Sequence, residues 1–167
     1  IKPFVFDDCD NIDNDCDGSI DEDGPQDIYE PNDTENYDLG YYTAGGYVNI
    51  EGVILDLTDI DNFEFYLEDG WTDDFSIEVE LHAISLQTDF VVELWLIESA
   101  EGDTNQQLLS LNNVGPGLGE IGNYQGEGVS WDYPLGYDDS GYYQVIVTAL
   151  TGQDCTAAYE LEIRMSY

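Results

Sequence analysis

Acidic residues at alternating positions near the start of the chain are the residues best placed to do chemistry. Residues 13–24 read Asp-Asn-Asp-Cys-Asp-Gly-Ser-Ile-Asp-Glu-Asp-Gly. Calcium is bound by oxygen ligands, and a tight loop supplies them from every second residue. Such a loop has a glycine at its sharpest turn, and Gly18 occupies that position here. Counting from the first aspartate, the candidate calcium ligands are Asp13, Asp15, Asp17, the carbonyl group of Ser19, Asp21 and Asp23.

This acidic loop departs from the calcium loops of helical proteins at its twelfth position. Gly24 stands where a bidentate glutamate is expected, so Glu22, Asp23 or a water molecule would have to complete the coordination. No helical hydrophobic period flanks the loop, so it is not an EF-hand. The alternative interpretation is a solvated acidic linker that binds no ion.

Residues 9–22 resemble a metal-binding motif of secreted bacterial proteins and the thrombospondin type 3 calcium repeat, with one copy where those proteins have several. Three cysteines allow three disulfide pairings. The short separation of Cys9 and Cys16 favours a disulfide between them, because closing a short loop costs little entropy. Cys155 would then be free or paired between chains, and three unpaired thiols are the alternative.

The charge of the chain excludes several classes of partner. Two Lys and Arg residues stand against 38 Asp and Glu residues, which gives a formal net charge of −36. Nucleic-acid backbones and anionic membranes are bound by clustered cations, so neither is an expected partner, and no apolar run is long enough to insert into a membrane. Self-repulsion at this charge opposes folding, so high salt or bound cations must offset it.

From about residue 27 onward the hydrophobic pattern is that of a β protein. Side chains alternate between apolar and polar along 75–83 and 159–165, and apolar runs at 90–97 and 142–150 indicate strands buried on both faces. Further strands are expected at 47–55, 63–67 and 106–111, and a long Gly-rich loop at 112–128. The sequence therefore predicts an all-β protein, an antiparallel β-sandwich of jelly-roll or Greek-key type, preceded by the acidic calcium-binding loop.

Short motifs in this β region resemble the bacterial pre-peptidase C-terminal domain. Glu30-Pro31-Asn32-Asp33-Thr34 is similar to the opening motif of that family. Ile50-Glu51-Gly52-Val53-Ile54, followed by the acidic stretch 59–65, is similar to its second landmark, and the end of the chain, 141–165, matches its closing strands. The resemblance covers about 27–167 and implies a small calcium-bound β-sandwich of the kind attached to secreted hydrolases.

The same resemblance implies a second metal site in which the opening motif meets a later acidic loop. The implied ligands are Glu30, Asn32, Asp33, Asp59 and Asp61, with Asp56 as an additional candidate. Turn formation by Asn and Asp side chains is the alternative role for the opening motif. Asn32-Asp33-Thr34 is also a glycosylation sequon, and we favour the metal because a metal-bound amide would not easily carry a glycan.

No residue pattern predicts an enzyme. The single histidine, His82, is expected on the polar face of a strand, and no serine lies in a nucleophile motif. Several aromatic residues in or near expected loops could stack on sugars or anchor protein partners, or else pack at the edge of the core. They are Tyr41, Tyr42, Tyr47, Trp71, Trp131, Tyr133 and Tyr137.

Three regions follow: an apolar segment at 1–6, the acidic loop and linker at 7–26, and the sandwich at 27–167. Ile1, Phe4, Val5 and Phe6 could add a strand to a neighbouring subunit and build a homopolymer. We take the first residue, which is not Met, to indicate a processed, exported product. The expected function is that of a calcium-binding extracellular structural protein. The alternative is an accessory module of a secreted hydrolase that grips polysaccharide or fibrous protein.

Overall fold

The computed structural model of the chain describes residues 28–43, 45–54, 57–68, 75–84, 88–99, 102, 104–112, 120–126, 140–151 and 157–166. The acidic loop with its six predicted ligands, the three cysteines and the apolar segment 1–6 lie outside the described residues. Asp56, Trp71 and Trp131 lie outside them as well. The predictions for these positions therefore stay predictions.

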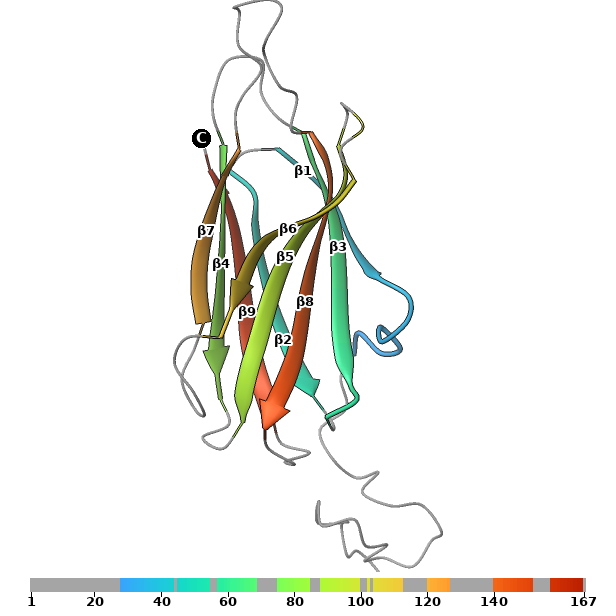
Figure 1. The fold of residues 1–167 in the computed structure, drawn as a ribbon, viewed down its shortest axis with the longest axis vertical. Coiled ribbons are helices and arrows are strands. Elements are labelled where there is room, and N and C mark those ends of the chain that lie inside the picture. Colours follow the sequence, from blue (N-terminus) through green and yellow to red (C-terminus); the bar gives the residue numbers. More distant parts are fainter. Residues whose placement is uncertain are drawn as a thin grey trace, which may run out of the picture.

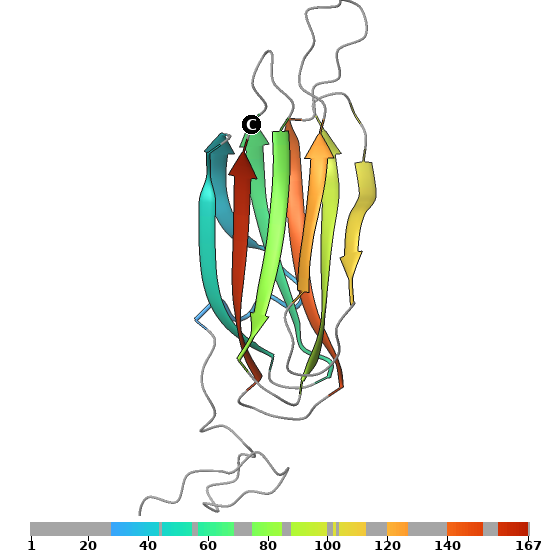
Figure 2. The ribbon, with the colours of Figure 1, turned by 90° about the vertical axis from the view of Figure 1, so that its left-hand side faces the viewer.

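Nine strands make up the regular structure of the described residues. They are β1 (Tyr37–Thr43), β2 (Tyr47–Ile54), β3 (Ile60–Glu68), β4 (Phe75–Ala83), β5 (Asp89–Ser99), β6 (Thr104–Leu111), β7 (Glu120–Gly126), β8 (Gly141–Thr151) and β9 (Ala157–Ser166). They form a five-stranded sheet in the order β1-β3-β8-β5-β6 and a four-stranded sheet in the order β2-β9-β4-β7. Figure 1 shows the two sheets stacked as layers, and Figure 2 faces the four-stranded sheet. The predicted all-β sandwich is confirmed.

Strand pairing is antiparallel in both sheets except between β1 and β3, which run parallel. The chain leaves the first sheet after β1, passes through β2 in the opposite sheet, and returns as β3 in the original direction. The predicted antiparallel β-sandwich is confirmed, with one parallel pair at this edge.

The core lies between the sheets and follows the alternation in the sequence. On β4, Ile77, Val79 and Leu81 are fully buried, and Leu161 and Ile163 of β9 lie beside them on the same inner face. Each such side chain contributes about 1.5–3 kcal/mol when it is removed from water. Because a strand alternates its faces, the residues between them are left on the outer surface.

The runs 90–97 and 142–150 do not form strands buried on both faces. In β5 and β8 alternate residues are fully buried, while those between them, such as Trp95 and Gln144, are half-buried on the outer face. The predicted loop at 112–128 also contains β7, which pairs with β4 at the edge of its sheet. In β7, Ile121 is exposed and Gly122 lies against Leu109 and Leu111, so the strand lacks the apolar alternation that would have revealed it.

Candidate metal centre

The opening motif is held against the start of β3 by side-chain hydrogen bonds. The backbone N–H of Ile60 donates to the Asp33 carboxylate at 3.0 Å, and the Asn62 amide donates to the Asn32 carbonyl at 2.9 Å and to the Asp33 carbonyl at 3.2 Å. The backbone N–H of Asn32 donates to the Glu30 carboxylate at 3.0 Å. These bonds fix the segment 30–33 beside the residues that precede β3.

This docking gathers three carboxylates at one point. Glu30, Asp33 and Asp59 each place a carboxylate oxygen within 4.8 Å of the other two. Like charges at this separation repel, so the arrangement is favourable when a cation lies among them. The group, called the metal cluster below, could hold a metal ion, and its three residues all belong to the predicted ligand set.

Asn32 supplies a second observation that points to a cation. Its side chain is 0% exposed, yet neither its Oδ1 nor its Nδ2 atom has a hydrogen-bond partner. A buried polar group without a partner costs about 1–3 kcal/mol. An amide oxygen is a ligand that calcium accepts, so an ion held by these carboxylates would give the Asn32 Oδ1 atom a partner. A glycan on Asn32 would need an accessible Nδ2 atom, which the structure does not provide.

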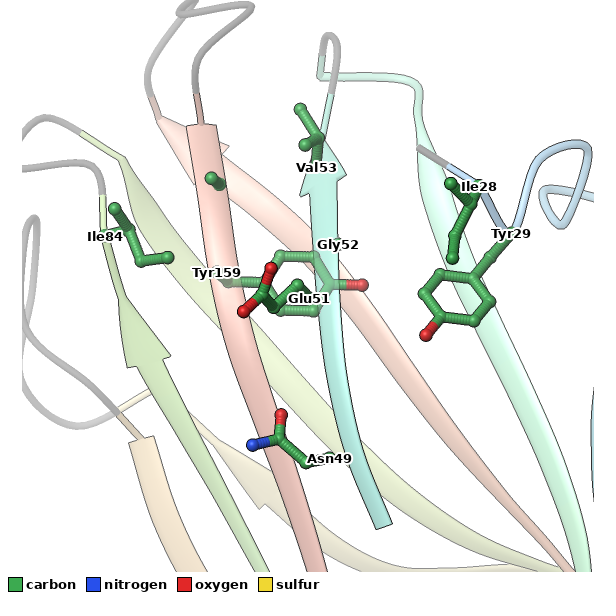
Figure 3. Close-up of a pocket in the computed structure, with 9 residues that line it drawn as sticks. Ile28, Tyr29, Asn49, Glu51, Gly52, Val53, Ile84 and Tyr159 are labelled. Carbon is green, nitrogen blue, oxygen red and sulfur yellow. The ribbon is translucent and has the colours of Figure 1, made fainter. Parts of the chain in front are cut away.

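Asp61, the fifth predicted ligand, is held by the opposite sheet. It is fully buried, and its Oδ2 atom accepts a hydrogen bond of 2.5 Å from the hydroxyl of Tyr159 on β9. Figure 3 shows the Tyr159 ring crossing β2 at Gly52, with the hydroxyl directed toward the side on which Ile28 and Tyr29 lie. Tyr159 therefore joins the two sheets close to the metal cluster.

Gly52 leaves room for the Tyr159 ring because it has no side chain. A Cβ atom at position 52 would lie 2.3 Å from the Tyr159 hydroxyl oxygen, which is closer than any real contact. Gly52 belongs to a motif that was recognised in the sequence, but neither its close approach to Tyr159 nor the role of Tyr159 was predicted. A glycine inside an alternating strand is itself a sign of close approach, so this signal was present.

A second group of carboxylates lies on the outer face of the four-stranded sheet. Glu80, His82 and Glu162 could also hold a metal by geometry, but Arg164 occupies the same surface. Its guanidinium lies 2.6 Å from Glu78 and 2.9 Å from Glu80, and it also bonds Glu162. The bonds to Glu78 and then Glu80 raise the pKa of Arg164 above its ordinary value. This arginine cluster already has a cation, whereas Arg164, the sole Lys or Arg of the described residues, takes no part in the metal cluster.

His82 is exposed and lies 3.3 Å from Glu80. Its position on the polar face of β4 confirms the prediction from the sequence.

Comparisons with known proteins give similarities of fold. No family model matches the chain, and no curated protein matches it. Among solved structures, it is similar to the pre-peptidase C-terminal domain of collagenase from Bacillus anthracis, with 11% identity, a TM-score of 0.46, and coverage of 78% of this chain and 96% of that one. This is the domain type that the sequence motifs resemble.

Two further structures are similar to it. A carbohydrate-binding module specific for non-crystalline cellulose has 12% identity, a TM-score of 0.40, and coverage of 71% of this chain and 73% of that one. A periplasmic inhibitor of g-type lysozyme from Aeromonas hydrophila has 12% identity, a TM-score of 0.38, and coverage of 77% and 99%. At these values the similarities concern the arrangement of strands and carry no functional conclusion. Within the described residues, the chain forms no helix with the length and apolar character needed to cross a bilayer.

Proposed function

We propose that the chain is an extracellular calcium-binding β-sandwich that acts as a structural subunit and not as a catalyst. The observation that carries the proposal is the buried Asn32 side chain, whose amide has no partner beside three converging carboxylates. Glu30, Asn32, Asp33 and Asp59 would hold the ion, with Asp61 oriented by Tyr159 behind them. The ion would neutralise the carboxylates and fasten the segment 30–33 to β3.

Calcium is the cation that suits these ligands best. The donors are carboxylate and amide oxygens, which hard cations prefer, and calcium accepts irregular sets of six to eight such ligands more readily than magnesium does. Free calcium is abundant outside cells, which supports an extracellular location. The acidic loop at 13–24 would bind a further ion by the same chemistry.

The structural role rests on strand addition by the segment 1–6 to another copy. Both sheets end in edge strands, β1 and β6 in one and β2 and β7 in the other. Unpaired backbone groups along such an edge can accept an added strand. Addition from one copy to the next would build a homopolymer, and bound calcium would lower the repulsion between highly acidic copies.

A second candidate function is that of a binding module for polysaccharide or fibrous protein. It is favoured by a row of tyrosines on the outer face of the five-stranded sheet, of which Tyr41 is 58% and Tyr142 is 45% exposed. Exposed aromatic rings stack on sugars or anchor protein partners. Sedimentation with insoluble polymers distinguishes a monomeric module from a self-assembling subunit.

Asp59→Asn tests the metal cluster, because it removes one charge and keeps the shape of the side chain. In EDTA the variant should melt at a higher temperature than the unchanged protein, since one repelling carboxylate is lost. In calcium it should melt lower, and calorimetry should show calcium affinity reduced at least about tenfold, which is about 1.4 kcal/mol. Glu51→Gln, an exposed position on β2, removes the same charge and should leave both the calcium affinity and the rise in melting temperature from EDTA to calcium unchanged.

If Asp59→Asn and Glu51→Gln respond alike in EDTA and calcium, the cluster binds no ion and the proposal is wrong. The structural role has a separate test, since deletion of residues 1–6 should leave folded monomers in calcium. Polymers formed by this deletion variant would contradict strand addition by that segment and leave the metal cluster untouched.

A further inference from the structure

Three tyrosines lie side by side across three strands of the five-stranded sheet. Tyr41 on β1 is opposite Tyr66 on β3, and Tyr66 is opposite Tyr142 on β8. The rings of Tyr41 and Tyr66 stack with centroids 5.4 Å apart and an interplanar angle of 10°, and Tyr66 and Tyr142 meet edge to face at 5.1 Å and 74°. These residues, called the tyrosine row below, all point away from the core.

A β-bulge sets the outward position of Tyr41. The pairing of β1 with β3 shifts by one residue between Asp38 and Gly40, and Gly40 has a φ of 99°, a conformation that glycine adopts most readily. Leu39 and Tyr42 both pack against the core. In a regular strand Tyr41 would share a face with Leu39, so the extra residue turns the Tyr41 ring outward onto Tyr66.

The tyrosine row lines a cleft of about 490 Å³ whose charged groups are all acidic. Asp38, Gly40 and Glu68 complete the lining with the three tyrosines. The Tyr41 hydroxyl donates to Glu68, and the backbone N–H of Gly40 donates to Asp38 at 2.8 Å. The cleft therefore combines aromatic rings with two exposed carboxylates that have no cationic residue among the lining groups.

We propose that the tyrosine row, with Asp38 and Glu68, binds an arginine or lysine side chain of a basic partner segment. A guanidinium or ammonium group is attracted to the face of an aromatic ring, and the guanidinium plane also stacks on it. The carboxylates at the rim would pair with the same cation, and the strongly acidic chain would raise its local concentration. The ligand class follows from the joint presence of ring faces and negative charge.

Other occupants fit these features less well. A neutral sugar would use the rings but gain little from two carboxylates, and an anionic polysaccharide would be repelled. A second copy of this chain is a poor source of cations, because the sequence holds two Lys and Arg residues in all and Arg164 is paired with glutamates. A basic segment of a different protein is the occupant that uses both the rings and the charge.

This site is separate from the metal cluster. Tyr66 lies six residues along β3 from its first residue, Ile60, which is about 20 Å in an extended strand. Figure 1 shows β3 running the length of the sandwich, so the metal cluster and the tyrosine row lie toward opposite ends. The cation site can therefore fail without affecting calcium binding, and calcium binding can fail without affecting the cation site.

The test is calorimetric titration of the full chain, in calcium and about 150 mM salt, with an acetylated tetra-arginine peptide. A tetra-citrulline peptide of the same shape but without charge should not bind. Tyr142→Leu should weaken tetra-arginine binding about two- to fivefold, the range expected for a cation–π contact at an exposed site. Glu68→Gln, which removes an exposed ion-pair partner, should weaken it by up to about fivefold. Glu51→Gln and Tyr47→Leu remove the same groups from the exposed surface of β2 and should leave the affinity unchanged.

Three results would overturn the proposal. An equal loss of tetra-arginine affinity in Glu68→Gln and Glu51→Gln would mean that the peptide is attracted to the acidic protein in general and not to this cleft. Binding of tetra-citrulline as tight as that of tetra-arginine would exclude recognition of charge. Binding of cellohexaose that Tyr142→Leu abolishes, with tetra-arginine binding intact, would assign the cleft to a neutral sugar. If Tyr142→Leu fails to fold, Tyr41→Leu on the edge strand gives the same readout.

Discussion

The metal cluster and the arginine cluster differ in whether a cationic side chain lies among their carboxylates. Each brings three or more carboxylates together on a chain with a net charge of −36. The arginine cluster carries its own cation, since Arg164 bonds Glu78, Glu80 and Glu162. Within the described part of the chain the metal cluster has no such residue, so a cation that neutralises it would have to come from solution. The stability of the segment at the metal cluster should therefore depend on the cations present in the buffer.

The two clusters also differ in burial. In the arginine cluster the side chains of Arg164 and Glu78 are 41% and 35% exposed, and exposed ion pairs contribute little to stability. In the metal cluster Asp59 is 8% exposed, Glu30 is half-buried and Asp33 is exposed, while Asn32, next to Asp33 in the chain, is fully buried. A cation bound at Asp59 and Asn32 would interact in a medium of lower effective dielectric constant, so its removal would cost more. Disrupting the metal cluster should therefore lower the stability of the protein more than disrupting the arginine cluster does.

The largest effect is expected from Gly52→Ala, which affects one cluster and spares the other. The added methyl group would displace the buried Tyr159 ring, and overpacking of a core costs about 1–3 kcal/mol. Loss of the Tyr159–Asp61 hydrogen bond adds to this cost. Urea unfolding should show the loss of stability, and calorimetry should show weaker calcium binding.

Arg164→Met on β9 is the control for Gly52→Ala, because it disrupts the arginine cluster and not the metal cluster. Gly52 does not contact Arg164 or its glutamates, so an added Arg164→Met should lower stability by the same amount with alanine or glycine at position 52. Calcium binding that is unchanged in Gly52→Ala would show that the two sheets are not coupled at the metal cluster.

A smaller effect is expected from Asn62→Ala, which loosens the segment 30–33. The Asn62 amide donates to the carbonyls of Asn32 and Asp33, and loss of a buried hydrogen bond costs about 1–3 kcal/mol when an acceptor is left unsatisfied. The carboxylates would then be less well positioned, so calcium affinity should fall together with the melting temperature. Asn49→Ala, which removes an exposed bond to Glu160, should change neither.

The β-sandwich was predictable because its main signal is local. Alternation along 75–83 and 159–165 reports one buried face, and the structure places β4 and β9 there as paired neighbours. Two strands, β1 and β7, were not predicted from the sequence. β1 contains a bulge that breaks the period, and β7 exposes Ile121 and places Gly122 against the leucines of β6.

The metal cluster was predictable in part, and for a different reason. A family resemblance proposed five ligands, of which Glu30, Asp33 and Asp59 are brought together and Asn32 is buried beside them in the chain. The bond from Tyr159 to Asp61 spans 98 residues of sequence and joins two sheets. Contacts of this kind depend on the packing of the layers, which hydrophobic periodicity does not encode.

The smallest effect on stability, and the most direct test of the comparison, is expected from Arg164→Met. The substitution removes the internal cation and leaves Glu78, Glu80 and Glu162 close together on an exposed face, so melting in EDTA should fall only slightly. Made in the Asp59→Asn background, where the metal cluster is disabled, it should create a new rise in melting temperature with calcium. Arg164→Lys keeps the charge and should create none. A variant that stays insensitive to calcium would show that solvent already neutralises these glutamates, so that the contrast between the two clusters arises from burial and not from the source of the cation.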